Sequence, residues 1–360
     1  MDPEKRADLV LRHVAEAVTP EEVRALFERT DRPRAYIGFE PSGPLTVAHL
    51  IPARTMLDLR EAGAELTVFL ADWHAFVNDK LGSDLDRIRA SGEAMTAAFR
   101  ALGVDGPSVR YRWASELVRS PGYWERVLRV AKATTLARTR RAMSILGRDE
   151  SATELDTAKL FYPSMQVADI FELPVDLAYG GLDQRRAHVL AREVAHHYHW
   201  PVPAAIHTPL LSALSGGGRM DPTDGGVERK MSKSDPSSSI ALAAPPEEIE
   251  AKVRAAYCPR NVVDGNPVVE AARFIVLPWE RRLVLERSPA HGGTLEFTDG
   301  ATFVDAYARG ELHPLDLKAA VAAALARIAA PARAAASASG HARPTGGSPS
   351  GDGRGPRGPS

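Results

Sequence analysis

Cysteine is almost absent from this chain of 360 residues, which contains only Cys258. One thiol cannot form a disulfide within the chain, and it cannot by itself supply the several ligands of a metal cage. The lack of an internal disulfide is typical of a protein from a reducing compartment. The cysteine content therefore excludes a disulfide framework and a cysteine-based metal centre.

Long apolar runs and an excess of charge of one sign are missing as well. No stretch approaches the roughly 20 apolar residues of a membrane-spanning helix, and residues 1–11 lack the apolar core of a signal peptide. The formal net charge of −1 excludes a wholly basic nucleic-acid-binding coat, although it leaves room for a local basic patch. We expect a soluble, cytoplasmic protein that has no membrane partner.

Apolar residues make up 44% of the chain, enough to bury a full core, and the length predicts two domains. Short apolar stretches alternate with amphipathic ones. The predicted strands are 35–39, 66–71, 109–113 and 175–179. The predicted helices are 47–61, 84–102 and 161–171, and a long helical region is predicted at 121–147. This alternation indicates an α/β fold with a Rossmann-like, doubly wound parallel sheet.

The two ends of the chain differ from this region. The first 33 residues predict two amphipathic helices, the second capped by Thr19, with Pro20 at its first position and Glu22 in the capping-box position. Helices at 246–257, 267–276 and 313–328 predict a smaller helical domain. Thirteen of the last twenty residues are Gly, Pro or Ser, which predicts a disordered tail. The expected units are 1–33, 34–240, 241–332 and 333–360.

The stretch from Tyr36 to His49 reads Y-I-G-F-E-P-S-G-P-L-T-V-A-H, a strand that runs through a glycine turn into a helix. Backbone N–H groups and the positive end of the helix favour a phosphate or a nucleotide at such a turn. The stretch matches neither the dinucleotide fingerprint nor the lysine-containing phosphate loop. By itself it fits an ordinary strand-to-helix turn equally well.

A second stretch, Lys230 to Ser234, reads K-M-S-K-S within a segment, 208–239, that is rich in Gly, Ser, Pro and Asp. Its two lysines suit the neutralisation of a triphosphate whose charge shifts during a reaction. A solvated basic loop is the alternative, since a long loop in a compact domain is usually either functional or disordered. Together with the glycine turn and His49, the motif favours a nucleotide site.

Further polar side chains are predicted near the same edge of the sheet, where doubly wound folds bind their ligands. Tyr162, Gln166 and Asp169 are spaced four and three residues apart and share one helical face. A second glycine turn, Gly180–Gly181, leads into Asp183 and Gln184. His74 follows another strand, where lining a pocket and a purely structural role are equally compatible with the sequence.

Six segments together make the chain resemble a class I aminoacyl-tRNA synthetase, specifically a tyrosyl-tRNA synthetase of the archaeal and eukaryotic type. They are Y-I-G-F-E-P-S-G at 36–43, L-A-D-W-H-A at 70–75, Y-P-S-M-Q-V-A-D-I at 162–170, G-G-L-D-Q-R-R-A-H at 180–188, K-M-S-K-S at 230–234 and E-L-H-P-L-D-L-K at 311–318. The resemblance covers nearly everything except the tail and residues 219–228. It implies a catalytic domain at 34–240 and an anticodon-binding-like domain at 241–332.

The resemblance implies that L-tyrosine is activated with ATP and transferred to the 3′ end of tRNA(Tyr). The tyrosine carboxylate attacks the α-phosphate, pyrophosphate leaves, and a terminal ribose hydroxyl of the tRNA takes the tyrosyl group. Mg²⁺ is expected to arrive with ATP, without a dedicated protein metal site. Since no protein nucleophile is needed, catalysis would rest on positioning and charge stabilisation.

The resemblance also assigns residues to each substrate. Tyr36 and Asp169 match the positions that bind the phenolic hydroxyl of tyrosine. Tyr162, Gln166 and Gln184 match those that hold its ammonium group, although a half-buried polar pair is the alternative for the first two. His49, Lys230 and Lys233 match the catalytic positions. The expected ATP-binding residues are Gly38, Thr46, Ala48, His49, Asp183, Lys230, Met231 and Lys233.

One signature departs from the family pattern, because H-x-G-H stands here as T-V-A-H at 46–49. Thr46 can donate a hydrogen bond but cannot carry charge. Ala48 adds a methyl group where the family glycine lies against adenine, as it does in some eukaryotic members. The departure predicts weaker ATP binding.

The segment 126–148 holds seven basic residues and no acidic one, which indicates either a tRNA surface or a merely solvated helix face. The helical region 121–147 corresponds to the dimer interface of the family, so we expect a homodimer. The positions that match tRNA contacts of the family are Arg140, Arg141, Arg185 and Arg186 for the acceptor end and His291, His313 and Asp316 for the anticodon. Phosphate contacts of this kind would weaken steeply with salt.

Two alternative functions remain at the level of the sequence. The first is a related enzyme that forms an aminoacyl-adenylate for an acceptor other than tRNA. The second is a catalytically weak, tRNA-binding regulatory protein, which Thr46 and Ala48 make conceivable. Tyrosine-dependent exchange of pyrophosphate into ATP, followed by transfer to tRNA, distinguishes the three.

Overall fold

The computed structural model describes residues 1–143, 156–216, 231 and 238–338. Its centre is a six-stranded sheet with the order β1-β6-β5-β2-β3-β4. The strands are β1 (Glu16–Ala17), β2 (Arg34–Phe39), β3 (Glu65–Leu70), β4 (Val109–Trp113), β5 (Leu177–Gly181) and β6 (Ala204–Thr208). β2 to β6 are parallel, and the chain proceeds outwards in both directions from β2, which confirms the predicted doubly wound sheet.

Two strands of the sheet escaped prediction. β6 pairs in parallel with β5. β1 pairs antiparallel with the other edge of β6, with Glu16 opposite His207. β1 is only two residues long, so it carries no periodic signal. Its position nevertheless brings the N-terminal segment to the edge of the sheet.

Successive side chains of the inner strands point to opposite faces, as the period of two in a strand requires. In β2, Ala35 and Ile37 enter one buried cluster and Tyr36 enters the other. In β3, Val68 and Phe69 divide in the same way. Because both faces are covered, the inner strands are apolar without strict alternation.

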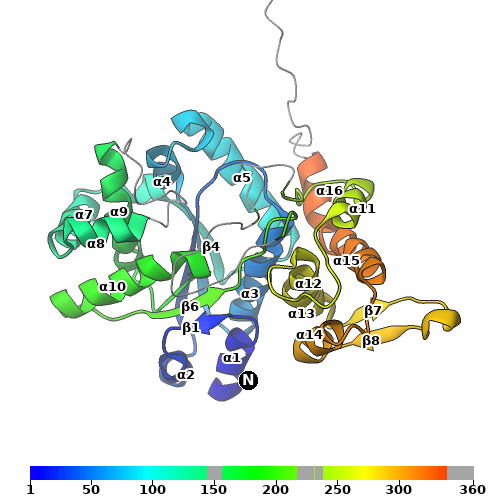
Figure 1. Cartoon of the computed structure of the whole chain (residues 1–360). Helices are drawn as coiled ribbons and strands as arrows, with labels where there is room; N and C mark the ends of the chain where they lie inside the picture. The colour runs from blue at the N-terminus through cyan, green and yellow to red at the C-terminus, as the bar shows by residue number, and fades with distance from the viewer. Residues whose placement is uncertain (144–155, 217–230, 232–237, 339–360) are drawn as a thin grey trace, which may run out of the picture.

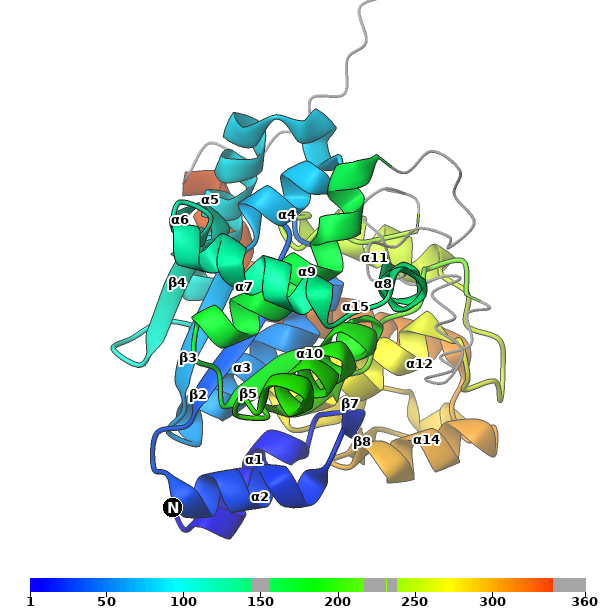
Figure 2. The same cartoon turned by 90° about the vertical axis from the view of Figure 1, so that its left-hand side faces the viewer.

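Helices cover both faces of the sheet (Figures 1 and 2). The helices of the first two thirds of the chain are α1 (Pro3–Leu11), α2 (Pro20–Arg29), α3 (Leu50–Glu61), α4 (Asp72–Val77), α5 (Leu85–Ala101), α6 (Ala114–Leu117), α7 (Pro121–Lys132), α8 (Leu136–Ala142), α9 (Thr157–Glu172) and α10 (Arg185–Tyr198). Short 3₁₀ turns are η1 (Val47–His49), η2 (Lys80–Ser83) and η4 (Leu182–Gln184). In Figure 2, α7, α9 and α10 lie in front of the strands, on the face to which Tyr36 points.

Three local predictions are refined by the structure. The helical region 121–147 contains two helices within its described part, because the Thr135 hydroxyl accepts a hydrogen bond from Arg138 N–H and caps a new helix, α8. α9 begins at Thr157 rather than near Phe161, and Pro163 lies inside it. Thr19 is the N-cap of α2, as predicted, but its side chain makes no capping hydrogen bond.

The C-terminal third packs beside the sheet (Figure 1). Its elements are α11 (Pro246–Ala255), α12 (Pro267–Ala271), the short π-helix η5 (Ala272–Val276), α13 (Leu277–Glu280), β7 (Leu283–Leu285), η6 (Pro289–His291), β8 (Leu295–Phe297), α14 (Gly300–Ala308), α15 (Pro314–Ile328) and α16 (Ala330–Ala338). The predicted start of the tail at residue 333 was wrong, since α16 continues to Ala338 and packs on α5. Residues 339–360 lie outside the described part of the chain.

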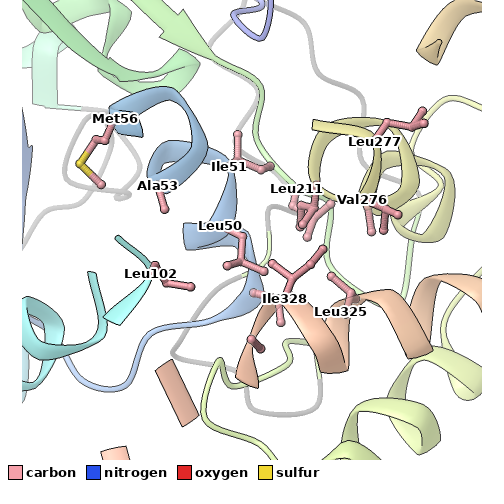
Figure 3. Close-up of a cluster of buried hydrophobic side chains, with 14 of the residues drawn as sticks. Leu50, Ile51, Ala53, Met56, Leu102, Leu211, Val276, Leu277, Leu325 and Ile328 are labelled. Atoms are coloured by element: carbon pink, nitrogen blue, oxygen red, sulfur yellow. The ribbon is translucent and has the colours of Figure 1, made fainter. Parts of the chain in front are cut away.

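One buried cluster joins α3 to the C-terminal helices (Figure 3). Leu50 and Ile51 belong to it together with Leu325 and Ile328, all at most 8% exposed. Trp279 Nε1–H also donates to the carbonyl of Leu50 over 2.9 Å. The division at 240 stays a prediction, because apolar side chains from both sides of it share one core.

Among the described residues, no single helix is long and apolar enough to cross a membrane, although the bent pair α15 and α16 meets that test by length and composition alone.

Candidate functional site

Two stretches that are far apart in the sequence lie side by side beyond the carboxyl end of β2. Thr46 and Ala241 form an antiparallel bridge. Beside it, Val47 N–H donates to the carbonyl of Ile240 over 2.9 Å. The structure therefore places the T-V-A-H signature against the segment that follows K-M-S-K-S.

Of the K-M-S-K-S motif itself, the two lysines lie outside the described residues. Met231 is described, is 7% exposed and donates its N–H to the carbonyl of Leu211 over 2.7 Å. The bond ties the motif to the chain that follows β6. The roles expected of Lys230 and Lys233 stay predictions.

Thr46 holds the imidazole of His49 at the start of α3. The Thr46 N–H donates to His49 Nδ1 over 3.2 Å, and Thr46 Oγ1 lies 3.2 Å from the same atom. Nδ1 also lies 3.2 Å from the carbonyl oxygen of Thr46, so a backbone donor and a backbone acceptor both face this atom. The threonine is 4% exposed and caps η1. Ala48 is half-buried and packs against the main core.

Asp169 and Tyr36, expected at the phenolic hydroxyl of tyrosine, are both buried on the α9 side of β2, at 1% and 3% exposure. Asp169 Oδ1 accepts a hydrogen bond from the hydroxyl of Tyr123 over 2.9 Å. Its Oδ2 lies 3.0 Å from Nε2 of His74. His74 therefore belongs to this polar cluster, which settles its position though not its role.

The cluster shifts the pKa values of its members. Burial raises the pKa of the Asp169 carboxyl, and His74 and Tyr123 only partly offset it. Burial by itself would lower the pKa of His74, but Asp169, Glu40 and Asp72 outweigh it and raise the pKa. Burial, followed by the charge of Asp169, raises the pKa of Tyr36. The hydroxyl of Tyr36 thus stays protonated and able to donate.

A second polar group lies where the ammonium of tyrosine is expected. The hydroxyl of Tyr162 donates to Glu40 Oε1 over 2.5 Å, and Asn78 Nδ2 donates to both oxygens of that carboxylate over 3.1 Å. Burial, and then the charge of Glu40, raises the pKa of Tyr162. Because the Tyr162 proton points to Glu40, its oxygen lone pairs are available to accept.

Gln166 and Gln184 complete this group. Gln166 Nε2 donates to Gln184 Oε1 over 2.9 Å, which links α9 to η4. Gln166 Oε1 is buried and has no hydrogen-bond partner among the described residues. A buried acceptor without a partner is costly, and a bound cationic donor would satisfy it.

A side chain at either of two glycines near the strand ends would displace a neighbouring side chain. A Cβ on Gly181 would lie 2.6 Å from Oδ1 of Asp183. A Cβ on Gly38 would lie 2.6 Å from the hydroxyl of Tyr36, and Gly38 is itself exposed although β2 is the central strand. Gly38 therefore leaves room for the Tyr36 hydroxyl, in addition to the expected approach of a ligand.

The basic residues expected at the acceptor end of tRNA lie on α8 and at the start of α10. Arg140 and Arg141 are exposed, and Arg186 donates to the carbonyl of Arg141 over 3.1 Å. Arg185 differs, because its Nε donates to Glu16 over 2.7 Å. The structure thus gathers three of the four residues on one surface and ties the fourth to β1.

The residues expected at the anticodon lie in the C-terminal third. His313 is the N-cap of α15, and its Nδ1 accepts from Leu315 N–H over 3.2 Å. Asp316 lies in the first turn of the same helix, and His291 ends η6. His313 therefore has a structural function at the helix end, and its contact with RNA stays a prediction.

Other features of the structure lie apart from this site. A cavity of about 670 Å³ lies between α5 and β4, and its walls include Arg89, Arg100 and Trp113. None of the predicted site residues lines it. Within the described part of the chain, no group of three or more His, Cys, Asp or Glu is placed to hold a metal ion.

Three residues of the polar clusters were not identified as site residues from the sequence. Glu40 stands within the Y-I-G-F-E-P-S-G segment, so its proximity to Gly38 was a usable signal. Asn78 and Tyr123 carried no such signal. Tyr123 lies 46 residues from Asp169, and only the packing of α7 on α9 brings them together.

Comparison with known proteins agrees with this geometry. The family model described as class I tRNA synthetases for tryptophan and tyrosine matches residues 28–330. The tyrosine–tRNA ligase of Sulfurisphaera tokodaii is 43% identical over 341 residues, which cover 92% of this chain and 93% of the relative. That of Aeropyrum pernix is also 43% identical over 341 residues, covering 93% of this chain and 94% of the relative.

Solved structures give the same result. The tyrosyl-tRNA synthetase of Aeropyrum pernix superposes with a TM-score of 0.82 at 41% identity, covering 93% of this chain and 95% of that one. The Archaeoglobus fulgidus enzyme complexed with L-tyrosine superposes with a TM-score of 0.84 at 38% identity, covering 93% and 99%. Both the matched segment and the fold therefore span most of the chain, which belongs to the tyrosine and tryptophan family of class I aminoacyl-tRNA synthetases.

Proposed function

We propose that this chain activates L-tyrosine with ATP and transfers it to tRNA(Tyr) through the residues of the site described above. Tyrosine–tRNA ligase activity follows from family membership and from relatives of that activity at 41–43% identity over about 92% of the chain. The observation that carries the residue assignments is the pair of buried polar clusters that α9 forms with β2 and η4. One cluster suits a phenol and the other an ammonium group.

The phenolic hydroxyl of the substrate would donate to Asp169 and accept from Tyr36. Both partners are buried, so phenylalanine would leave a buried donor and a buried acceptor without partners. Sites of this type discriminate by about 10⁴ to 10⁵, a figure that comes in part from tyrosyl-tRNA synthetases themselves. Tyr123 and His74 would hold the carboxylate of Asp169 in place.

The ammonium group of the substrate would donate to the hydroxyl oxygen of Tyr162 and to Oε1 of Gln166. The first is oriented by its bond to Glu40, and the second lacks another partner in the described part of the chain. Gln184 holds the amide of Gln166 in the matching orientation. The negative charge of Glu40 adds electrostatic attraction for the cation in a partly buried setting.

ATP would bind across the T-V-A-H signature, with its ribose at Asp183 and its phosphates near His49, Lys230 and Lys233. The substrate carboxylate attacks the α-phosphate and pyrophosphate leaves, so the protein supplies position and positive charge rather than a nucleophile. Mg²⁺ would enter as the counter-ion of ATP. The joined stretches around Thr46 and Ala241 support a shared nucleotide site.

For tRNA, we place the acceptor end over α8 and α10, where Arg140, Arg141 and Arg186 lie. The anticodon would meet the start of α15, at His313 and Asp316, and η6, at His291. Positive charge on α8 supports phosphate contacts. As the sole cysteine, Cys258 agrees with a reducing, cytoplasmic setting.

A homodimer would form through α7. Trp124 and Leu128 are one helical turn apart on this helix and are 39% and 60% exposed. Exposed large apolar residues at that spacing form one face, and a second copy of the chain would cover it. The same helix carries Tyr123 on its buried side, so the interface would adjoin the tyrosine site.

The test is the pair of partial reactions. Tyrosine-dependent exchange of pyrophosphate into ATP, followed by charging of tRNA(Tyr), is the expected result. No exchange with tyrosine would overturn the proposal. Exchange without charging would favour an adenylate-forming relative with another acceptor, and tRNA binding without exchange would favour a regulatory protein.

A further inference from the structure

A pair of buried histidines lies behind the glycine turn that carries Asp183 and Gln184. His188 of α10 and His207 of β6 are 2% and 0% exposed. Their rings are stacked with centroids 5.0 Å apart, and His188 Nδ1 lies 3.0 Å from His207 Nε2.

The pair continues to a carboxylate at the edge of the sheet. Nδ1 of His207 lies 2.9 Å from Oε2 of Glu16 on β1. The same carboxylate accepts from Nε of Arg185 over 2.7 and 2.9 Å. Glu16, His207 and His188 therefore form a continuous chain of hydrogen-bonding groups that starts at a charged surface pair and ends inside the protein.

Only one arrangement of protons satisfies this chain when both rings are neutral. An ionised carboxylate can only accept, so Nδ1 of His207 carries a proton. Its Nε2 must then accept, and Nδ1 of His188 must donate. Glu16 thus determines the tautomer of His188 through the intervening ring of His207. Both histidines hold the proton on Nδ1.

The inner end of the chain abuts the turn. Cε1 of His188 lies 3.2 Å from the position that a Cβ on Gly180 would occupy. Thr208, next to His207 in β6, donates its hydroxyl to the carbonyl of Gly180 over 3.4 Å. His188 also lies one helical turn after Gln184. The imidazole therefore lies directly beside Gly180, the first residue of the turn that ends at Gln184.

We propose that His188, oriented through His207 by Glu16, is a positioning residue for the turn that presents Asp183 and Gln184 to the substrates. The inference rests on the proposed function of those two residues and adds the device that holds them. Loss of the hydrogen bonds between Glu16, His207 and His188 would let the turn shift. Binding of the nucleotide and of the tyrosine ammonium group would then weaken together. The reacting groups themselves would remain.

The environment of the two histidines favours neutral imidazole rings. Burial, followed by the influence of His207, lowers the pKa of His188 to about 3. Burial and the guanidinium of Arg185 lower the pKa of His207 to about 4, while Asp183 acts in the opposite direction on both. A second proton would place two N–H groups against each other. The arrangement therefore persists at neutral pH.

The first experiment observes the tautomers directly and does not depend on activity. In the protein labelled with ¹⁵N-histidine, the signals of His188 and His207 should show the Nδ1–H tautomer and keep it from about pH 8 to about pH 5.5. The His188→Asn variant should remove one of these signals, and Glu16→Gln should perturb the other. Signals that titrate near the ordinary pKa of about 6.5, or that show Nε2–H, would overturn the proposal.

The second experiment measures the effect on substrate binding. His188→Leu should raise KM for both ATP and tyrosine in pyrophosphate exchange by about tenfold, the loss expected for one buried hydrogen bond, with a smaller change in kcat. His188→Asn retains a donor close to the Nδ1 position and should stay within about threefold of wild type. His196→Leu, at an exposed position on the same helix, is the matched control.

The outcomes separate this inference from the proposed function. If the wild-type protein catalyses no exchange, the proposed function fails, whereas the tautomer measurement still tests the chain of hydrogen bonds. If the wild type is active and His188→Leu leaves both KM values unchanged, the positioning role is wrong. Should His188→Leu not fold, Glu16→Gln preserves both imidazoles and should raise the two KM values in the same direction.

Discussion

Tyr162 donates the proton of its hydroxyl to Glu40 over 2.5 Å and so joins α9 to the turn that follows β2. The bond fixes which side of the phenol oxygen can accept from a ligand. It also places a carboxylate near the expected ammonium group. The pair therefore connects the segment at 36–43 with the segment at 162–170, and both segments would contribute to binding of tyrosine.

Glu40→Gln should raise KM for tyrosine by about tenfold, because it removes the charge that orients Tyr162 and attracts the cation. KM for ATP should change much less. Steady-state pyrophosphate exchange measures both values. Glu116→Gln, which breaks the exposed pair between Glu116 and Arg112, is the control and should leave both unchanged. An unaltered KM for tyrosine in Glu40→Gln would contradict this role.

Asp169→Ala should lower the discrimination between tyrosine and phenylalanine, since the acceptor for the substrate hydroxyl is lost. The ratio of kcat/KM for the two amino acids measures it, and a decrease of at least about a hundredfold is expected. Asp169→Asn keeps the volume and controls for the cavity left beside Tyr123 and His74. Undiminished selectivity in both variants would place the hydroxyl site elsewhere.

Thr46→Val keeps the shape of the side chain but removes the hydroxyl beside His49 Nδ1. KM for ATP should rise by about three- to tenfold, the usual effect of one lost hydrogen bond, with KM for tyrosine nearly constant. Thr46→Ser retains the hydroxyl and should resemble wild type. Equal ATP affinity in the valine and serine variants would mean that the backbone N–H alone holds the imidazole.

Stability should fall as the pH is lowered below about 6.5. The pKa values of His188 and His207 are about 3 and about 4 in the folded protein, so the folded state binds fewer protons than the unfolded chain. Their contribution is complete above the unfolded pKa and is lost as the pH falls. At about pH 5.5 each imidazole costs about 1.4 kcal/mol.

Urea unfolding at about pH 7.5 and about pH 5.5 measures this loss. His74 acts in the opposite direction, because its raised pKa stabilises the folded state at low pH and that contribution disappears as the pH rises. The His188→Asn variant isolates the buried pair, since it should reduce the difference between the two pH values by about 1.4 kcal/mol. An identical difference in wild type and variant would show that the imidazole is not held neutral.

Leu128→Glu should convert the proposed homodimer into monomers, because it introduces a charge into the apolar face of α7. Sedimentation velocity measures the change directly. Leu315→Glu alters an equally exposed leucine on α15 and should leave the oligomeric state unchanged. A wild-type protein that is already monomeric at micromolar concentration would contradict the proposed interface.

The alternation of apolar stretches and helices was sufficient to predict the parallel sheet, since β4 has the bounds expected from its composition and β2 differs by one residue. Spacing within α9 also predicted that Tyr162, Gln166 and Asp169 share a face. These predictions succeeded because strand and helix periods are local properties. The periodicity of a helix or a strand predicts only local structure and does not predict which distant segments come into contact.

The sequence by itself thus determined the alternation of the four predicted strands with helices, the family and the residues that its motifs contain. Only the tertiary structure decided that Thr46 lies against Ala241, that Tyr123 holds Asp169, and that Glu16 reaches His188 through His207. These contacts join elements that are far apart in the sequence, so local periodicity does not predict them. They form because buried polar groups require hydrogen-bond partners, and only the packing of the elements decides which groups meet.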